Sequence, residues 1–158
     1  MTSFLIEGGY PLSGDVTPSG NKNAALPLLA ATILTDQPVI LRNIPNIGDV
    51  QAMRRLLESL GATVELLDEN SWRIQAKHVR RANLDPELCR RIRASILLAG
   101  PMLGREGGID IPPPGGDVIG RRRVDTHLLT FRSLGATTEF ADREYHITAP
   151  KGLQGANL

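Results

Sequence analysis

The sequence predicts a mixed α/β fold of the α+β class, built from two copies of a βαβαββ unit. The first observation is an internal repeat, because ESLGATVE at residues 58–65 returns as RSLGATTE at residues 132–139. The second is the order of patterns, since each half of the chain reads as helix, strand, helix and hairpin. The third is composition: 41% hydrophobic and 22% charged residues are typical of a globular protein.

Around the helix ends the repeat has an offset of 74, because Gly61 and Gly135 lie 74 positions apart and each follows a Ser-Leu pair, whereas SWRIQA (71–76) returns as EYHITA (144–149) one residue out of phase. Chance similarity of two Leu-Gly-Ala helix ends is the alternative, but the shared order of elements favours duplication. A single unit has one sheet and one layer of helices, so each copy is expected to bury its core against the other. Three more pairs of apolar residues coincide at this offset: Val50 with Val124, Leu57 with Phe131, and Leu60 with Leu134.

The first half carries a clear amphipathic helix at Asp49–Leu60. Its apolar residues recur on one face, and Gly61 suits the left-handed position that follows a helix. Before it, Ser19–Asn21 resembles the entrance of an Ala/Leu-rich helix, with Pro27 close to the first turn. The other elements expected in this half are strands at Phe4–Glu7, Leu12–Thr17 and Val39–Arg42, and a hairpin of Ala62–Leu67 with Ser71–Ala76.

The second half opens on Asp85-Pro86-Glu87, a strong helix start with an Asp cap and Pro at the first helical position. This helix is expected to run towards Leu103, with Pro101 ending or kinking it. The elements expected after it are a strand at Gly108–Ile111, a helix at Val124–Leu134 closed by Gly135, a hairpin of Ala136–Phe140 with Tyr145–Ala149, and the start of a strand at Leu153–Leu158.

Composition excludes several classes of partner. The net charge of +1 and the 4% aromatic content argue against a nucleic acid or an anionic membrane surface. The single cysteine, Cys89, rules out an internal disulfide and fits a cytoplasmic location. The N-terminus lacks the basic start and apolar run of a secretory signal, and no apolar stretch is long enough to cross a bilayer.

The stretch that carries most chemistry is GGDVIGRRRVD, residues 115–125, which follows a proline run and leads into a helix start. A helix start presents free N–H groups and positive dipole charge, and Arg121, Arg122 and Arg123 add guanidinium groups that suit phosphate or carboxylate. The stretch therefore predicts an anion-binding loop that contains one acidic group, Asp117. The alternative is a solvated run of arginines, which the preceding Gly-Gly pair disfavours.

Two further basic positions stand at the N-terminal ends of Ala-rich helices, one in each repeat, and these ends are called the helix mouths. They are Lys22, with Asn23 beside it, in the first half and Arg93 in the second. Together with the loop they indicate a ligand with several negative charges, such as a phosphorylated metabolite or a nucleotide. Composition alone does not separate this role from a structural one for Lys22, and Arg90 and Arg91 are interpreted as a solvated face.

The sequence indicates neither a metal site nor a dinucleotide site. The histidines His78, His127 and His146 are scattered and lack partners at ligand spacing, and neither a Walker motif nor GxGxxG occurs. His127 occupies the repeat position of Met53, so a packed, hydrogen-bonded role is expected for it. Cys89 is expected to be a buried small side chain rather than a nucleophile. No cofactor is therefore implied.

Four separate segments resemble one family of enzymes, in order along the chain: SGNKNAALPLLAA (19–31), NIPNIGDV (43–50), RASILLAGPML (93–103) and GGDVIGRRRVDTHL (115–128). They are similar to the UDP-N-acetylglucosamine enolpyruvyl transferases, the MurA family. The resemblance implies transfer of enolpyruvyl from phosphoenolpyruvate to the 3-hydroxyl of UDP-N-acetylglucosamine, the first committed step of peptidoglycan synthesis. The shikimate 3-phosphate transferases fit less well, because their first motif has a different Ser-rich pattern after the lysine.

The resemblance implies an inside-out α/β barrel of three βαβαββ units, of which this chain supplies two and the third is absent. Substrates would bind in a cleft between this domain and a second one. An interrupted barrel is expected to leave an apolar face and open sheet edges, which favour self-association. The expected division is 1–20 as strands of the other domain, 21–80 as the first unit, 81–150 as the second unit with the catalytic loop 112–123, and 151–158 as the start of a further strand.

The resemblance also implies roles for single residues. Lys22 would bind the phosphate of phosphoenolpyruvate, Asn23 would help to hold the UDP-sugar, and Arg93 would contact the substrates from the second unit. Arg122 matches the loop arginine that meets phosphoenolpyruvate, and Asp117 falls where many members carry a catalytic cysteine. The segment that would line the uridine pocket comprises Arg123, Val124, Asp125 and Thr126.

Asp117 is the departure from the family with the clearest consequence. An unperturbed Asp has a pKa of about 3.9, against about 8.5 for Cys, so Asp117 could act as a general acid at neutral pH only if the closed site raised its pKa. The resemblance therefore implies resistance to fosfomycin, which alkylates the cysteine thiol. Other catalytic groups of the family fall beyond Leu158, so the chain alone is expected to be inactive. The alternatives are a non-catalytic nucleotide- or phosphate-binding module and a purely structural domain.

Overall fold

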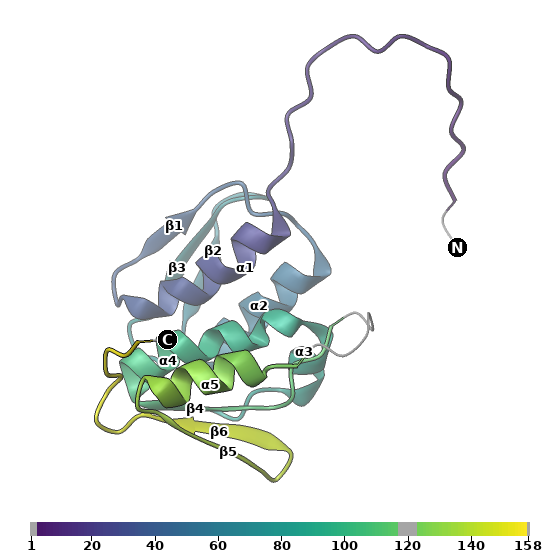
Figure 1. Cartoon of the computed structure of the whole chain (residues 1–158). Coiled ribbons are helices and arrows are strands. Elements are labelled where there is room, and N and C mark those ends of the chain that lie inside the picture. The colour runs from purple at the N-terminus through teal and green to yellow at the C-terminus, as the bar shows by residue number, and fades with distance from the viewer. Residues whose placement is uncertain (1–2, 117–122, 158) are drawn as a thin grey trace.

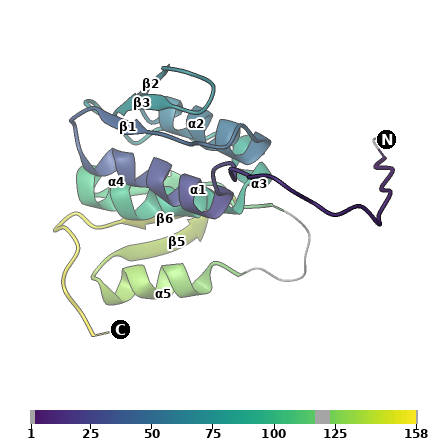
Figure 2. The ribbon, with the colours of Figure 1, turned by 90° about the horizontal axis from the view of Figure 1, so that it is seen from above.

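The repeated unit predicted from the sequence is visible in the two sheets of the chain. In a computed structural model, which describes residues 3–116 and 123–157, each sheet has three strands, in the orders β1-β3-β2 and β4-β6-β5. In both sheets the central strand pairs antiparallel with its two neighbours. Figures 1 and 2 show α1 and α4 between the two sheets, whereas α5 lies apart from these helices and contacts β5. The mixed α/β fold class is confirmed.

The elements of the first half are α1 (Lys22–Ala31), the short 3-10 helix η1 (Thr32–Leu34), β1 (Val39–Leu41), α2 (Gly48–Ser59), β2 (Thr63–Leu66) and β3 (Trp72–Gln75). Those of the second half are α3 (Pro86–Arg91), the 3-10 helix η2 (Arg93–Leu98), α4 (Ala99–Glu106), β4 (Gly108–Ile111), α5 (Asp125–Ser133), β5 (Thr137–Ala141) and β6 (Glu144–Thr148). Within the described residues, each half thus lacks the first strand of a βαβαββ unit.

The ends of α2 and α5 are equivalent in detail. Both helices are followed by a glycine in the left-handed region, with φ of 101° at Gly61 and 88° at Gly135. The next residue donates a hydrogen bond back into the helix, from Ala62 N–H in the first half (3.0 Å) and from Ala136 N–H in the second (2.9 Å). A Cβ at Gly61 would lie 2.4 Å from the carbonyl oxygen of His78, so no side chain fits there. The repeated Leu-Gly-Ala motif therefore encodes one helix cap used twice.

The two halves share one hydrophobic core. Buried side chains of α1, α2, η2 and α4 pack between the sheets, and Trp72 and Ile74 of β3 and Ile147 of β6 close this core from either side. In contrast, each of the nine described residues of α5 stays at least partly exposed, and Leu129 is 58% exposed. No helix within the described ranges has the length and apolar character needed to cross a membrane.

The single helix expected from Pro86 towards Leu103 is wrong. The chain leaves the helix at Ile92, whose backbone is extended (φ −130°, ψ 129°), and resumes as η2 and then α4. The reason lies in the loop, because the N–H groups of Gly115 and Gly116 donate to carbonyl oxygens in the last turn of α3 at 3.0 and 2.8 Å. These bonds replace those that a further helical turn would make.

The two prolines in the helices also lie elsewhere than expected. Pro27 is the sixth residue of α1 rather than part of its first turn, so α1 lacks one backbone hydrogen bond in its interior. Pro101 neither ends nor interrupts a helix, because it is the third residue of α4, where a missing N–H costs little. The helix α4 continues to Glu106 and ends at Gly107, which has a φ of 66°.

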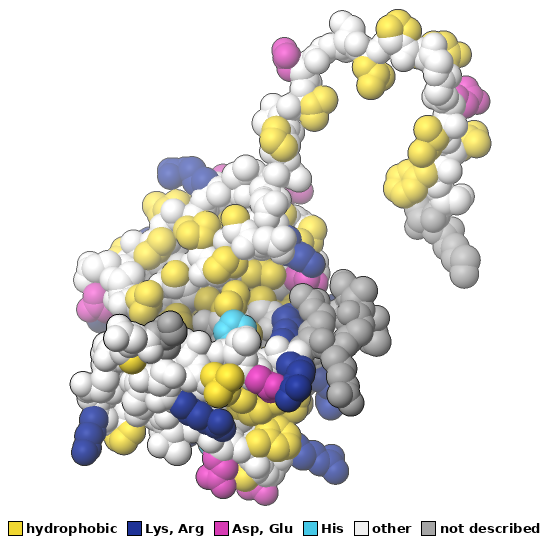
Figure 3. Space-filling model, viewed as in Figure 1, with side chains coloured by type: hydrophobic (Ala, Val, Ile, Leu, Met, Phe, Trp, Pro, Cys, Tyr) yellow, Lys and Arg dark blue, Asp and Glu magenta, His cyan; other side chains and the backbone are white. Residues whose placement is uncertain are grey.

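The strands expected at Phe4–Glu7, Leu12–Thr17 and Leu153–Leu158 are wrong for the described residues. Residues 3–19 are exposed and irregular, and Figures 1 and 3 show this segment as an arm that extends away from the body. Residues 153–157 are likewise without strand pairing. A strand needs a neighbouring strand for its backbone hydrogen bonds, and no described strand pairs with either segment, although the Gln154 N–H donates to the carbonyl oxygen of Leu134 at 2.8 Å.

Arg105 ties the two halves together. It lies in the last turn of α4, and its guanidinium donates to the carbonyl oxygens of Ile33 (2.7 Å) and Ala76 (3.1 Å), both in the first half. These acceptors are partly buried, so water cannot fully replace the arginine. The contact fixes α4 against the end of η1 and the end of the first sheet.

We expect Arg105→Met to lower the free energy of unfolding by about 1–3 kcal/mol, because it leaves two carbonyl oxygens without their charged donor. The measurement is urea denaturation of the chain. Arg55→Met serves as the control, since Arg55 is an exposed arginine of α2. Equal losses for the two variants would show that Arg105 does not link the halves.

Candidate functional site

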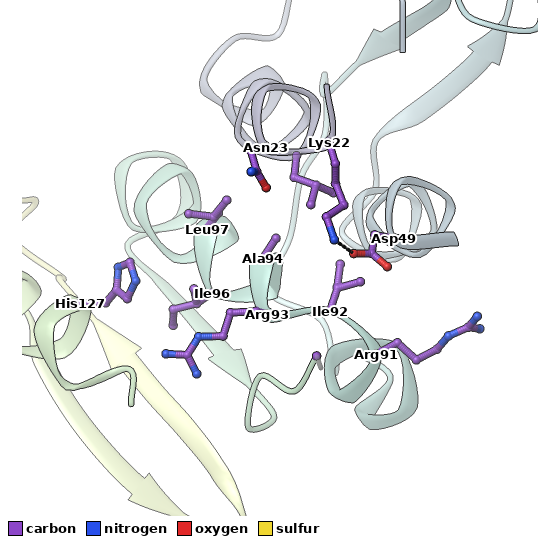
Figure 4. Close-up of a pocket in the computed structure, with 12 residues that line it drawn as sticks. Lys22, Asn23, Asp49, Arg91, Ile92, Arg93, Ala94, Ile96, Leu97 and His127 are labelled. Carbon is purple, nitrogen blue, oxygen red and sulfur yellow. Dashed lines mark hydrogen bonds and ion pairs between the residues drawn. The ribbon is translucent and has the colours of Figure 1, made fainter. Parts of the chain in front are cut away.

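A cavity of about 300 Å³ lies between the N-terminal ends of α1 and η2. It brings together Lys22 and Asn23 from the first half and Arg93 from the second, the three residues expected at the two helix mouths (Figure 4). The remaining walls are partly apolar and partly polar, formed by Leu26, Asp49, Arg91, Ile92, Ala94, Ile96, Leu97, Gly116 and His127.

The entrance of α1 positions Lys22. The side chain of Asn21 accepts hydrogen bonds from the N–H groups of Asn23 (2.7 Å) and Ala24 (3.2 Å), so the helix starts at Lys22. Gly20 packs so tightly on the segment before α2 that a Cβ there would lie 1.8 Å from a carbonyl oxygen of that segment. This packing brings the Lys22 Nζ within 2.9 Å of Asp49 Oδ2 in the first turn of α2.

The position of Lys22 is locally unfavourable. It is the first residue of α1, where the helix dipole is positive, and the first turn of α1 has no acidic residue. A cation at this end of a helix is stabilised only by an anion brought from elsewhere. Asp49 supplies one such negative charge, and an anionic ligand in the cavity would supply another. Lys22 therefore stands where a nearby negative charge is stabilising, and Asp49 provides one in this structure.

The second helix mouth, the start of η2, arises because α3 ends just before Ile92. Because α3 stops there, Arg93 becomes the first residue of η2, and its guanidinium donates to the backbone carbonyl of Arg123. The start of the loop is held against the same point: a Cβ on Gly116, whose φ is 98°, would lie 3.2 Å from the backbone nitrogen of Arg93. Arg93 is thus fixed between the two ends of the loop that the sequence singles out.

The residues expected to line a uridine pocket do not line this cavity. Arg123 forms an ion pair with Asp125 (2.5 Å), and Val124 is buried. Thr126 borders a second cavity of about 290 Å³, which shares His127 with the first. Two expected site residues, Asp117 and Arg122, lie outside the described residues.

Three residues of the cavity, Asp49, His127 and Arg91, were not predicted to belong to it. The sequence identifies Asp49 only as the start of a helix, although the repeat offset places it at the position of Arg123. His127, for which a packed, hydrogen-bonded role is expected, is partly buried and lies on the wall of the cavity. Arg91, interpreted as solvated, borders the cavity, and in Figure 4 its guanidinium points away from Lys22.

Cys89 is buried in α3, as expected from the sequence. Burial raises the pKa of its thiol to about 11, against a smaller opposing effect of the Ser95 hydroxyl. The thiol is therefore protonated at neutral pH and is no nucleophile. No cluster of three His, Cys, Asp or Glu side chains that could hold a metal ion occurs among residues 3–116 and 123–157.

A second group of ionisable residues lies outside the cavity, on the second sheet. Asp110 Oδ1 accepts from Arg81 (2.6 Å) and lies 2.7 Å from His146 Nδ1. Partial burial acts to raise the pKa of Asp110, but the hydrogen bonds to His146 and Arg81 outweigh it and the pKa is lowered. The hydrogen bond to Asp110 raises the pKa of His146, with a further contribution from the carbonyl of Ala141.

Comparison with known proteins decides the family. The sequence pattern of EPSP synthase (3-phosphoshikimate 1-carboxyvinyltransferase) matches residues 6–157. The chain belongs to the EPSP synthase family. The structure of the enolpyruvyl transferase NikO from Streptomyces tendae superposes on it with a TM-score of 0.73 and 27% identity, covering 93% of this chain and 32% of that one.

Within this family, three similar proteins carry the same name. A UDP-N-acetylglucosamine 1-carboxyvinyltransferase of Bradyrhizobium diazoefficiens is 54% identical over 155 residues, which cover 98% of this chain and 36% of that protein. Proteins of the same name from Treponema denticola and Coxiella burnetii are 48% and 42% identical over the whole chain and are covered to 37% and 36%. The chain thus spans about a third of the length of these relatives.

We expect the Arg81–Asp110–His146 group to make stability depend on pH. Because the folded pKa of His146 is raised, its contribution is fully present below its unfolded value of about 6.5 and is lost as the pH rises through the folded value. Asp110 acts in the opposite sense and contributes above about pH 3.9. Urea unfolding of wild type and His146→Gln between pH 5 and 9 should therefore converge at alkaline pH. A difference independent of pH, or one that persists in the Asp110→Asn background, would contradict this.

We expect Gly115→Ala to displace the base of the loop. A Cβ at this position would lie 1.8 Å from the carbonyl oxygen of Arg90, so either the loop or the end of α3 must move. The expected cost is about 1–3 kcal/mol in unfolding free energy, with altered NMR shifts of the Arg93 amide. Gly100→Ala is the control, because a Cβ there meets nothing within 4 Å. An unchanged Arg93 amide in Gly115→Ala would disprove the link between loop and helix break.

Proposed function

We propose that this chain forms part of a UDP-N-acetylglucosamine 1-carboxyvinyltransferase, which transfers enolpyruvyl from phosphoenolpyruvate to the 3-hydroxyl of UDP-N-acetylglucosamine. In this role Lys22 and Arg93 bind anionic groups of the substrates, and Asn23 holds the UDP-sugar. The reaction would be the first committed step of peptidoglycan synthesis, in the cytoplasm. The proposal takes its substrates from the names of the relatives, which are 42–54% identical across the chain.

The observation that carries the proposal is the meeting of Lys22, Asn23 and Arg93 in one cavity. They come from the N-terminal ends of helices in different halves and line the same cavity. Lys22 stands against the positive end of its own helix, an arrangement that a bound anion stabilises. Apolar side chains such as Leu26 and Leu97 form part of the walls and strengthen electrostatic contacts in the cavity.

In this reaction Lys22, Asn23 and Arg93 bind the substrates and form no covalent bond with them. A bond forms between the 3-oxygen of the sugar and C2 of phosphoenolpyruvate, the C2–oxygen bond to phosphate breaks, and inorganic phosphate leaves with the hydroxyl proton. Cations beside the phosphate stabilise the charge that it gathers as it departs. Arg122 is proposed as a second phosphate ligand. Asp117 is proposed to give a proton to the methylene carbon as the sugar oxygen adds to C2, and that carbon loses a proton again as phosphate leaves, which restores the C=C bond. Arg123, Val124, Asp125 and Thr126 are proposed to meet the uridine part of the substrate.

Calorimetric titration with UDP-N-acetylglucosamine tests the binding part of the proposal. The chain is expected to bind this nucleotide sugar, and Asn23→Ala and Arg93→Met are each expected to weaken binding about tenfold, the loss of one good polar contact. Lys151→Met is the control, because Lys151 is exposed and does not line the cavity. Binding of shikimate 3-phosphate in preference to the nucleotide sugar would instead support the activity for which the family is described.

A phosphate-release assay tests the catalytic part. The chain alone is expected to release no phosphate from phosphoenolpyruvate and UDP-N-acetylglucosamine, and fosfomycin is expected not to label Asp117, because a carboxylate is a weaker nucleophile than a thiolate. Turnover by the purified chain would refute the first expectation, and a fosfomycin adduct on Asp117, detected by mass spectrometry, would refute the second.

A further inference from the structure

The two halves differ at one repeat position that lies beside the cations of the cavity. At the offset of 74, Asp49 of the first half corresponds to Arg123 of the second. Lys22 Nζ donates to Asp49 Oδ2 at 2.9 Å, whereas Arg93 donates to the backbone carbonyl oxygen of Arg123. In both copies this position thus accepts a hydrogen bond from the cation of its own half, through a carboxylate in the first and a neutral backbone carbonyl oxygen in the second.

We propose that Asp49 competes with phosphate for binding to Lys22. It holds the lysine when no anion is bound, gives way when phosphate arrives, and pairs with the lysine again when phosphate leaves. Asp49 would therefore keep the affinity for phosphate low and favour release of the phosphate product. The inference rests on the proposed function only for the identity of the anion.

The ion pair is placed so that exchange is possible. The side chains of Lys22 and Asp49 are 45% and 38% exposed, and both line the cavity. An ion pair this accessible to water is weak, because solvent screens the attraction and both side chains lose freedom in forming it. A doubly charged anion that reaches the lysine can therefore displace a singly charged carboxylate.

The negative charge of Asp49 remains stabilised when Lys22 binds another anion. It is the second residue of α2, a helix of 12 residues, and the acidic residue of its first turn. The positive end of the helix dipole stabilises a carboxylate at that place. At the same time a carboxylate close to the bound anion repels it, and this repulsion grows with the charge of the anion. Asp49 thus opposes a dianion more strongly than a monoanion.

The test compares sulfate with methyl sulfate, two tetrahedral anions that differ by one charge. They are titrated into the 158-residue chain while the backbone amide NMR shifts of Lys22 and Arg93 are followed. Asp49→Asn is expected to bind sulfate about two- to fivefold more tightly than wild type, the range of an exposed ion pair. The gain for methyl sulfate should be smaller. Asp49→Glu keeps the charge and should stay within about twofold of wild type.

Glu65→Gln is the matched control. It makes the same change in net charge and breaks another exposed ion pair of the first half, with Arg73 at 3.3 Å, but Glu65 does not line the cavity. Its sulfate affinity should equal that of wild type. A loss of pocket structure would weaken both anions in Asp49→Asn, opposite to the expected gain.

Sulfate binding by Asp49→Asn that is unchanged or weaker than wild type overturns the proposal, as does absence of sulfate binding by both proteins. The outcome is separable from that of the proposed function. Binding of UDP-N-acetylglucosamine together with unchanged sulfate affinity in Asp49→Asn refutes the role of Asp49 alone. The expected gain in sulfate affinity without binding of the nucleotide sugar refutes the proposed substrate alone.

Discussion

Two backbone hydrogen bonds decide where the second cation of the cavity stands. The N–H groups of Gly115 and Gly116 donate to carbonyl oxygens at the end of α3, oxygens that a continuing helix would use for its own next turn. Because the loop occupies them, Ile92 becomes extended and Arg93 opens η2 instead of lying inside a long helix. The same bonds fix the start of the loop beside Arg93. Loop, helix break and cation are thus consequences of one interaction.

Duplication explains why a binding cavity forms between the halves rather than within one of them. Each copy contributes a helix mouth with a cation, and packing the two copies on a shared core places α1 beside η2. The copies keep the same sheet order and the same glycine cap, which are matters of folding. They differ at one equivalent position, where the Asp49 carboxylate accepts from Lys22 in one copy and the Arg123 carbonyl accepts from Arg93 in the other. The copies therefore diverge at a position that contacts a cation of the cavity in both.

The sequence predicts the elements that local forces control. The helix α2 has an amphipathic face and Gly61 at its end, and both hairpins carry alternating apolar residues, so these were predicted correctly. The helix expected from Pro86 to Leu103 failed because the groups that interrupt it, at Gly115 and Gly116, belong to a distant part of the chain.

For the candidate site, the sequence identified the cations but not their counter-ion. Lys22 and Arg93 stand at helix mouths that composition and capping residues reveal, and the structure brings them into one cavity. The place of Asp49 in the cavity could not be predicted, because an acidic residue in the first turn of a helix needs no functional explanation. Burial explains why only some of the expected site residues line the cavity. The helices α1 and η2 are anchored in the shared core, whereas α5 has no buried residue within its described length. Side chains on the anchored helices already form a cavity, and Arg123 and Asp125, at the start of the exposed helix, pair with each other instead of lining it.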